Sequence, residues 1–428
     1  METYFHSVVL DDDKCIGCTN CIKRCPTQAI RVKDGKAMIL KERCIDCGEC
    51  IRTCPQGAKK SITDSIEKTE SFKYKIALTA PSLMGQFDEN IPPGKILSAL
   101  KLTGFDDIFE VSRGADIATH YTKQLLKEKA ERPLISSSCP AIVRLIQARF
   151  PNLIEHLIPL QSPMEISAIM ARKKALKSNP GLSPDEIGVF FISPCPAKVT
   201  SIINPIGAEK SNVNGVLSMS AVYPLIIKNL DKTADDETIV HTSSKGIGWA
   251  KPNGEVIALG IKNYLSVDGI DNAIGVLDTI ENGKLRHIDF IEITSCPNGC
   301  VGGPLNVENK YIARRRIRYL TEKYDSLPKN KSAMPKTDSS ATINDFIFTK
   351  PIEKMDIEIL GKNMIESMSM MEKIELISNQ LPDDMDCGAC GAPTCKALAE
   401  DIALGRADIN DCIVLLKDKL KKDAEAQK

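Results

Sequence analysis

Two runs of closely spaced cysteines near the start of the chain constrain its fold more than any other feature. Each run has the spacing C-x2-C-x2-C-x3-C and is followed directly by proline. The members are Cys15, Cys18, Cys21, Cys25, Cys44, Cys47, Cys50 and Cys54. In a reducing compartment, cysteines clustered in this way indicate metal ligands before disulfides.

The paired runs resemble the two-cluster bacterial ferredoxin, with its βαββαβ-type module. A cubane [4Fe–4S] cluster takes three thiolates from one tight loop and the fourth from elsewhere, and in this family the last cysteine of each run binds the other cluster. The resemblance therefore implies two ligand sets: Cys15, Cys18, Cys21 and Cys54, and Cys44, Cys47, Cys50 and Cys25. Two structural zinc sites are the alternative, but zinc favours paired C-x2-C knuckles. The intervening segment AIRVKDGKAMILKE alternates in polarity and contains Asp-Gly, which predicts a hairpin.

A second group of cysteines lies near the end of the chain, in the spacing C-x2-C-x4-C-x16-C. Its members are Cys387, Cys390, Cys395 and Cys412. The stretch before Cys412 has helical spacing of alanine and leucine, which would carry this residue back toward the loop. The segment resembles the small four-cysteine iron–sulfur domain of electron-transfer complexes in anaerobes, and a zinc knuckle is the alternative.

Four cysteines remain: Cys139, Cys195, Cys296 and Cys300. Their contexts are SSSCPAI, ISPCPAK and SCPNGCVGG, so that a Cys-Pro pair occurs in all three. Proline restricts the backbone next to the sulfur, and the glycines permit close approach to a bulky inorganic group. The other interpretation of these cysteines is ordinary buried core.

These three segments resemble the signatures of the iron-only ([FeFe]) hydrogenases, which have the forms TSCCPxW, MPCxxKxxE and ExMxCxxGCxGGG. The resemblance extends over roughly residues 73 to 325 and includes ALTAPSL, GFDDIFEVSRGAD and QSPMEI. It implies that the four cysteines bind a [4Fe–4S] cube and that Cys300 bridges to a two-iron subsite. It also implies that Lys198 contacts a cyanide ligand of that subsite, and that Ala80, Pro81, Ser162 and Pro163 surround the cofactor.

The chain departs from the family at positions that move protons. Active members carry a further cysteine just before the first ligand, and here that position is Ser138. A serine hydroxyl is far harder to ionise than a thiol of pKa ~8.5, so we expect a weakened relay. Ser193, Thr294 and Ser201 replace a methionine, a second methionine and a glutamate of the family pattern, and the stretch IATHYTK after GAD lacks the acidic residues that usually extend the proton route.

The pattern along the chain predicts a multidomain α/β and α+β protein. We expect a ferredoxin domain at residues 1–65, a two-lobed hydrogenase-like α/β domain at 73–325 and a linker at 326–345. A connector at 346–381 and a small helical iron–sulfur domain at 382–415 follow. Short apolar runs such as YKIALTA, IGVFFIS and IDFIEIT predict buried strands of parallel sheets, with helices between them.

Charge and composition narrow the function further. Acidic and basic residues balance at 56 each, which disfavours nucleic acid as a partner, and no run is long and apolar enough to span a membrane. The start lacks the basic and apolar pattern of a signal peptide, so a cytoplasmic location is expected. We expect four [4Fe–4S] clusters and a slow or sensory hydrogenase whose partners are hydrogen and a ferredoxin or signalling protein. The alternative is an electron-transfer or iron–sulfur assembly protein without the two-iron subsite.

Overall fold

The computed structural model describes residues 5–129, 131–326, 341–355, 357, 363–382 and 385–426. The chain forms two compact units, each built from separated segments. The first comprises Met1–Ser7, Asp46–Gly48 and Ser61–Lys354, and the second comprises Val8–Ile45, Glu49–Lys60 and Met355–Lys428. The expected linker at 326–345 lies mostly outside the described residues, as does part of the connector at 346–381.

Two parallel sheets form the core of the first unit, as the apolar runs predict. The larger has the strand order β6-β5-β8-β9 and the smaller the order β10-β11-β7. All seven residues of β8 are buried, as expected for a parallel strand covered on both faces. The strands are β5 Tyr74–Thr79, β6 Asp107–Glu110, β7 Leu134–Ile135, β8 Ile187–Ser193, β9 Gly215–Ser218, β10 Tyr264–Asp268 and β11 Phe290–Thr294.

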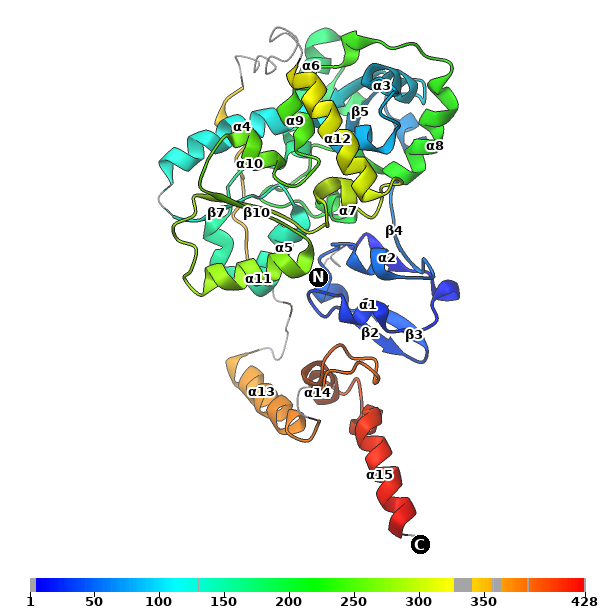
Figure 1. Ribbon diagram of the computed structural model, residues 1–428, viewed down its shortest axis with the longest axis vertical. Coiled ribbons are helices and arrows are strands. Elements are labelled where there is room, and N and C mark those ends of the chain that lie inside the picture. Colours follow the sequence, from blue (N-terminus) through cyan, green and yellow to red (C-terminus); the bar gives the residue numbers. More distant parts are fainter. Residues whose placement is uncertain are drawn as a thin grey trace. The chain divides into compact units, whose positions relative to one another are not determined.

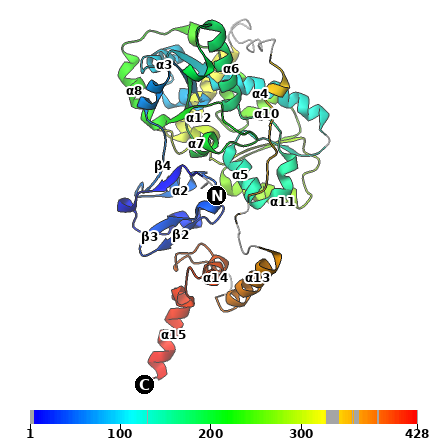
Figure 2. The ribbon, with the colours of Figure 1, turned by 180° about the vertical axis from the view of Figure 1, so that it is seen from behind.

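Helices surround both sheets of this unit. Figure 1 shows α3, α6 and α8 about the larger sheet and α5 and α11 beside the smaller one, and Figure 2 shows them from behind. The long helix α4 packs against α6, α9 and α10. The helices are α3 Pro93–Lys101, α4 Val111–Glu128, α5 Pro140–Arg149, α6 Pro163–Ser178, α7 Pro196–Ile203, α8 Met219–Leu230, α9 Ser244–Gly248, α10 Gly254–Leu259, α11 Ile270–Glu281 and α12 Lys310–Asp325.

The second unit combines the two iron–sulfur segments from opposite ends of the sequence. The predicted hairpin is present: β2 (Ile30–Lys33) pairs antiparallel with β3 (Lys36–Ile39). Its turn residues Asp34 and Gly35 both have positive φ, the geometry that makes Asp-Gly a hairpin signal. The remaining elements are β1 Val8–Leu10, β4 Lys59–Ser61, α1 Asn20–Lys23, α2 Glu49–Thr53, α13 Met364–Ser378, α14 Cys395–Ala403 and α15 Ile413–Ala426.

No helix in the part of the chain that the structure describes has both the length and the apolar character of a membrane span. The chain's mixed α/β architecture with parallel sheets matches the fold class that the sequence predicts.

We expect the strand that leads to Cys195 to be sensitive to loss of volume. Ile192 of β8 is fully buried, so Ile192→Ala should lower the free energy of unfolding by about 2–5 kcal/mol. Ile257, on α10, is 55% exposed, so Ile257→Ala should change the free energy of unfolding by less than about 0.5 kcal/mol. Anaerobic urea denaturation followed by circular dichroism measures both. Equal midpoints for the two variants would contradict the packing described for β8.

Candidate metal centre

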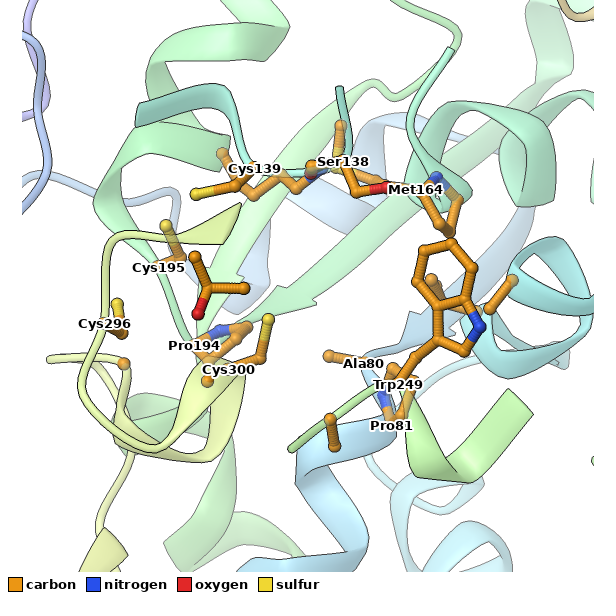
Figure 3. Close-up of a pocket in the computed structure, with 18 of the residues that line it drawn as sticks. Ala80, Pro81, Ser138, Cys139, Met164, Pro194, Cys195, Trp249, Cys296 and Cys300 are labelled. Carbon is orange, nitrogen blue, oxygen red and sulfur yellow. The ribbon is translucent and has the colours of Figure 1, made fainter. Parts of the chain in front are cut away.

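The ends of three parallel strands bring the middle cysteines to one cavity. Cys139 follows β7, Cys195 follows β8 and Cys296 follows β11, and Cys300 lies in the next turn. All four line a cavity of about 110 Å³ (Figure 3). This is the edge at which α/β folds place their binding sites.

A serine hydroxyl shows how near the distant cysteines come to one another. The Cys139 sulfur lies 3.7 Å from the Ser295 hydroxyl oxygen, and the Cys296 sulfur lies 3.8 Å from the same atom. Cys139 and Ser295 are 156 positions apart in the sequence. The structure therefore places Cys139 and Cys296 as neighbours, as a shared ligand set requires.

The Cys-Pro pairs have a structural reason. Cys139 and Cys195 are the N-cap residues of α5 and α7, and Pro140 and Pro196 occupy the first helical positions. Proline fits there because its fixed φ suits the helix and its missing N–H would be unpaired in any case. Each of these two cysteines therefore stands directly at the start of a helix.

Close backbone approach also shapes the third cysteine segment. A Cβ atom at Gly303 would lie 2.3 Å from the carbonyl oxygen of Pro194, which is nearer than any side chain allows. Glycine at this position therefore lets the turn that carries Cys300 pack directly against the turn that carries Cys195.

Burial opposes ionisation of two of these thiols, those of Cys195 and Cys300. Burial, followed by repulsion from Cys296 and Cys139, raises the pKa of Cys195 to about 12. Burial likewise raises the pKa of Cys300, although its side chain is exposed to the cavity. Metal ions reverse this preference because a coordinating thiol is deprotonated outright. Four converging sulfurs of this kind fit an iron–sulfur cube.

The cavity extends beyond the cysteines. Ala80, Pro81, Pro163, Met164 and Trp249 line it, and Figure 3 draws Ala80, Pro81 and Trp249 across from the cysteines. The cavity therefore has an apolar wall facing the cysteines. Ser162 is the N-cap of α6 and is not among the lining residues, whereas the following Pro163 and Met164 are; a contact of Ser162 with a cofactor stays a prediction.

Ser138 and Lys198 both line the cavity and contact each other. The Lys198 ammonium donates a hydrogen bond of 3.1 Å to the carbonyl oxygen of Ser138. Burial lowers the pKa of Lys198, while the neighbouring cysteines oppose this shift. Ser201 lies elsewhere: its hydroxyl donates to the Ala197 carbonyl within α7, and it does not line the cavity.

Two buried glutamates line the same cavity, and sequence reasoning missed both. The Ser136 hydroxyl donates to Glu255 at 2.6 Å, and the Ser266 hydroxyl donates to Glu292 at 3.3 Å. Burial, followed by the charge of Glu292, raises the pKa of Glu255 to about 8, and burial also raises the pKa of Glu292. Two signals were available for Glu292: it matches the glutamate that begins the signature ExMxCxxGCxGGG, and it is an acidic residue inside the apolar run IDFIEIT. Glu255, in GEVIALG, offers no such signal.

The first ferredoxin ligand set also surrounds one cavity. Cys15, Cys18, Cys21 and Cys54 line it together with Val32 and Lys59. Backbone amides of Ala37 and Ala58 donate to the sulfurs of Cys15 and Cys54 at 3.3 and 3.2 Å. Such N–H···S bonds help to set the potential of a bound cluster.

The other two predicted sets differ in how far the structure describes them. Cys47 belongs to the first unit, while Cys25, Cys44 and Cys50 belong to the second, so this set stays a prediction from the resemblance to ferredoxins. The C-terminal four line one cavity at the start of α14: Cys387, Cys390, Cys395 and Cys412.

Comparison with known proteins agrees with this geometry. The chain matches the family described as "Iron only hydrogenase large subunit, C-terminal domain" over residues 73–254 and 219–304. A 4Fe–4S dicluster domain matches residues 7–55, and a putative Fe–S cluster domain matches residues 381–414. The chain therefore belongs to the iron-only hydrogenase large-subunit family, and it is an iron–sulfur protein.

Individual relatives are distant. Iron hydrogenase 1 of Clostridium pasteurianum is 26% identical over 76% of this chain and 70% of its own length. The periplasmic [Fe] hydrogenase large subunit of Nitratidesulfovibrio vulgaris is 28% identical over 70% of this chain and 86% of its own length. A variant of the [FeFe]-hydrogenase HydA1 from Chlamydomonas reinhardtii has the same fold, with a TM-score of 0.53, 15% identity and coverage of 68% of this chain and 98% of that one.

We predict that Cys195→Ala removes about four irons per chain, because one missing thiolate leaves the cube without its ligand set. Thermal stability of the first unit should fall as well, since the bound metal joins segments that are far apart in the sequence. Iron analysis and anaerobic melting measure the two effects. Ser201→Ala, on the helix that Cys195 caps but away from the cavity, serves as the control and should keep the full iron content. Unchanged iron in Cys195→Ala would assign this cysteine to ordinary core.

We also predict a dependence of stability on pH that arises from Glu255. Its pKa rises from an ordinary 4.5 to about 8 on folding, so the folded protein holds a proton that the unfolded chain releases. The free energy of unfolding should therefore fall as the pH rises from about 4.5 to 8. Glu255→Gln should flatten this fall, whereas Glu281→Gln, at an exposed position on α11, should not. Urea midpoints across this pH range decide the matter, and a fall of equal size in Glu255→Gln would contradict the assignment.

Proposed function

We propose that this protein interconverts hydrogen with two protons and two electrons at low turnover, in the manner of a hydrogen or redox sensor. The observation that supports it best is the shape of the cavity. Four cysteines gather at one part of the cavity, while Ala80, Pro81 and Trp249 leave further space beside them. A two-iron subsite, when bound there, supplies the chemistry of the hydrogen molecule. Cys300 is drawn between the other cysteines and these residues in Figure 3, which suits it to bridge the two parts.

Protons in this proposal travel by the chain's own carboxyl groups. Ser138 lines the cavity where active relatives have a thiol, and its hydroxyl does not ionise near neutral pH. Glu255 lies within hydrogen-bond reach of Ser136, and a carboxyl with a pKa of about 8 both gains and loses a proton near neutral pH. From the cavity, the proposed proton route continues through Glu292 to the half-buried Ser266, whose hydroxyl donates to Glu292.

Electrons reach the cavity from the ferredoxin segment that belongs to the first unit. Gly48, next to Cys47, approaches Pro196 so closely that a Cβ there would lie 2.9 Å from the proline ring. Pro196 directly follows Cys195, and the Ser7 hydroxyl donates to the Pro196 carbonyl at 2.9 Å. The segment of Cys47 thus packs against the segment of a cavity cysteine. We propose that four [4Fe–4S] clusters, one for each set of four cysteines, make up the route to a redox partner protein.

A second candidate function is a non-enzymatic electron-transfer or assembly role with a cube alone in the middle site. It is supported by similarity to the cytosolic Fe–S cluster assembly factor NAR1 of Yarrowia lipolytica, which is 24% identical over 22% of this chain. That match covers far less of the chain than the hydrogenase relatives do.

Infrared spectroscopy separates the two functions. Protein produced without air, together with the maturation proteins of this family, should show carbonyl and cyanide stretching bands. Cys300→Ala should lose them, because the bridge to the subsite is gone. A wild-type spectrum without these bands, in a protein that holds its full iron complement, would establish the electron-transfer function instead.

Proton supply is tested by exchanging single residues around the cavity. Glu255→Gln should lower hydrogen evolution from a reduced dye by ~10²-fold, the lower range for a positioned proton-transfer group. Ser138→Cys should raise turnover by up to ~10²-fold for the same reason.

Ser137→Cys is the matched control for the second change. Its hydroxyl donates to the Leu160 carbonyl rather than lining the cavity, so a thiol there should leave turnover unchanged. Wild-type turnover in Glu255→Gln would rule out the carboxyl route. An equal gain from Ser137→Cys and Ser138→Cys would show that the position before the ligand has no special role.

A further inference from the structure

The C-terminal cysteine loop and the first ferredoxin cavity share a backbone hydrogen bond. The Val32 amide donates to the carbonyl oxygen of Gly391 at 2.8 Å. Val32 lines the cavity of Cys15, Cys18, Cys21 and Cys54, and Gly391 directly follows Cys390 of the C-terminal set. One hydrogen bond therefore links the walls of two cysteine-lined cavities.

The two loops meet more closely than side chains would permit. A Cβ atom at Gly391, whose φ is +84°, would lie 1.8 Å from the carbonyl oxygen of Val32. A Cβ atom at Gly388 would lie 3.4 Å from the side chain of Ile22, which follows Cys21. Gly388 follows Cys387 and Gly391 follows Cys390, so the loop that carries these two cysteines packs against the ferredoxin fold.

Two buried ion pairs hold this contact. Arg31, next to Val32, pairs with Asp401 of α14, and both side chains are less than 10% exposed. Arg43 pairs with Glu400 at 2.9 Å, again with both side chains less than 10% exposed. Buried pairs add little net stability because desolvation opposes them, but an unmatched partner is strongly unfavourable. They therefore specify one docking geometry for α14, the helix that Cys395 begins.

We propose that the C-terminal cysteine set is docked on the first ferredoxin set as its direct electron-exchange neighbour, with Arg31, Arg43, Glu400 and Asp401 as positioning residues. In this arrangement one electron from an external one-electron donor enters at the C-terminal set and passes across the Val32–Gly391 contact. No bond is formed or broken and no proton moves. The inference rests on the proposed function only for the presence of clusters in these two sets, and it requires neither the two-iron subsite nor hydrogen turnover.

Paramagnetic resonance of the full-length protein tests the coupling. In dithionite-reduced wild type, spin–spin interaction should broaden or split the signal relative to Cys412→Ala, which lacks the C-terminal cluster. Gly391→Ala should abolish this interaction, because its Cβ cannot coexist with the Val32 carbonyl. Gly405→Ala is the matched control: Gly405 also has positive φ, at +71°, but no atom lies within 4 Å of its Cβ position. The control should keep the wild-type line shape.

Hydrogen exchange of the Val32 amide reports docking independently. Exchange should be slow in wild type and in Gly405→Ala and at least tenfold faster in Gly391→Ala. Arg31→Gln changes a residue away from the cysteines, so it tests docking even if Gly391→Ala loses its C-terminal iron. Exchange of the Val32 amide should be faster in Arg31→Gln, as in Gly391→Ala. Arg406→Gln breaks an exposed pair with Glu42 and should behave as wild type.

Two results would overturn the proposal. One is a wild-type spectrum that equals the sum of the Cys412→Ala spectrum and the signal of an isolated, non-interacting cluster. The other is retention of coupling and of Val32 protection in both Gly391→Ala and Arg31→Gln. Neither result bears on the infrared bands or on hydrogen evolution, so failure of this inference is distinguishable from failure of the proposed function.

Discussion

The gathering of four cysteine sulfurs at one cavity is the constraint on which the first unit depends. Burial and mutual repulsion raise the pKa of Cys195 and of Cys300, so the sulfurs can gather as thiolates only around a positively charged group. The surrounding fold is arranged accordingly. Strands of both parallel sheets end at this cavity, and Cys139 and Cys195 each begin a helix there. Cofactor and tertiary structure therefore stabilise each other.

Features encoded over short stretches could be predicted from the sequence. The hairpin follows from alternation around Asp34 and Gly35, and β5, β8 and β11 follow from apolar runs that end before loops. The four cysteines of the cavity could be grouped from the sequence because they remain after the other two groups are assigned and because their segments resemble the family signatures. Resemblance to a family added Ala80, Pro81 and Pro163, which do line the cavity.

Features that depend on packing between distant segments could not be predicted. Ser162 directly precedes the lining residue Pro163, yet it is not itself among the residues that line the cavity. Glu255 joins the site through Ser136, more than a hundred residues earlier in the chain, and nothing in its local sequence distinguishes it. The joining of the C-terminal segment to the ferredoxin in one unit rests on pairs such as Arg31 with Asp401, which no local pattern reveals.

Ser138 and Cys139 are neighbours in the sequence but differ in their roles at the cavity. Cys139 is the N-cap residue of α5. Ser138, the residue before it, lines the cavity and contacts Lys198 only through its backbone carbonyl oxygen. The side chain of residue 138 can therefore change the chemistry of the cavity wall while the cysteine beside it keeps its place at the start of α5. In this part of the chain, neighbouring positions divide two tasks: one shapes the backbone of the site and the other lines its interior.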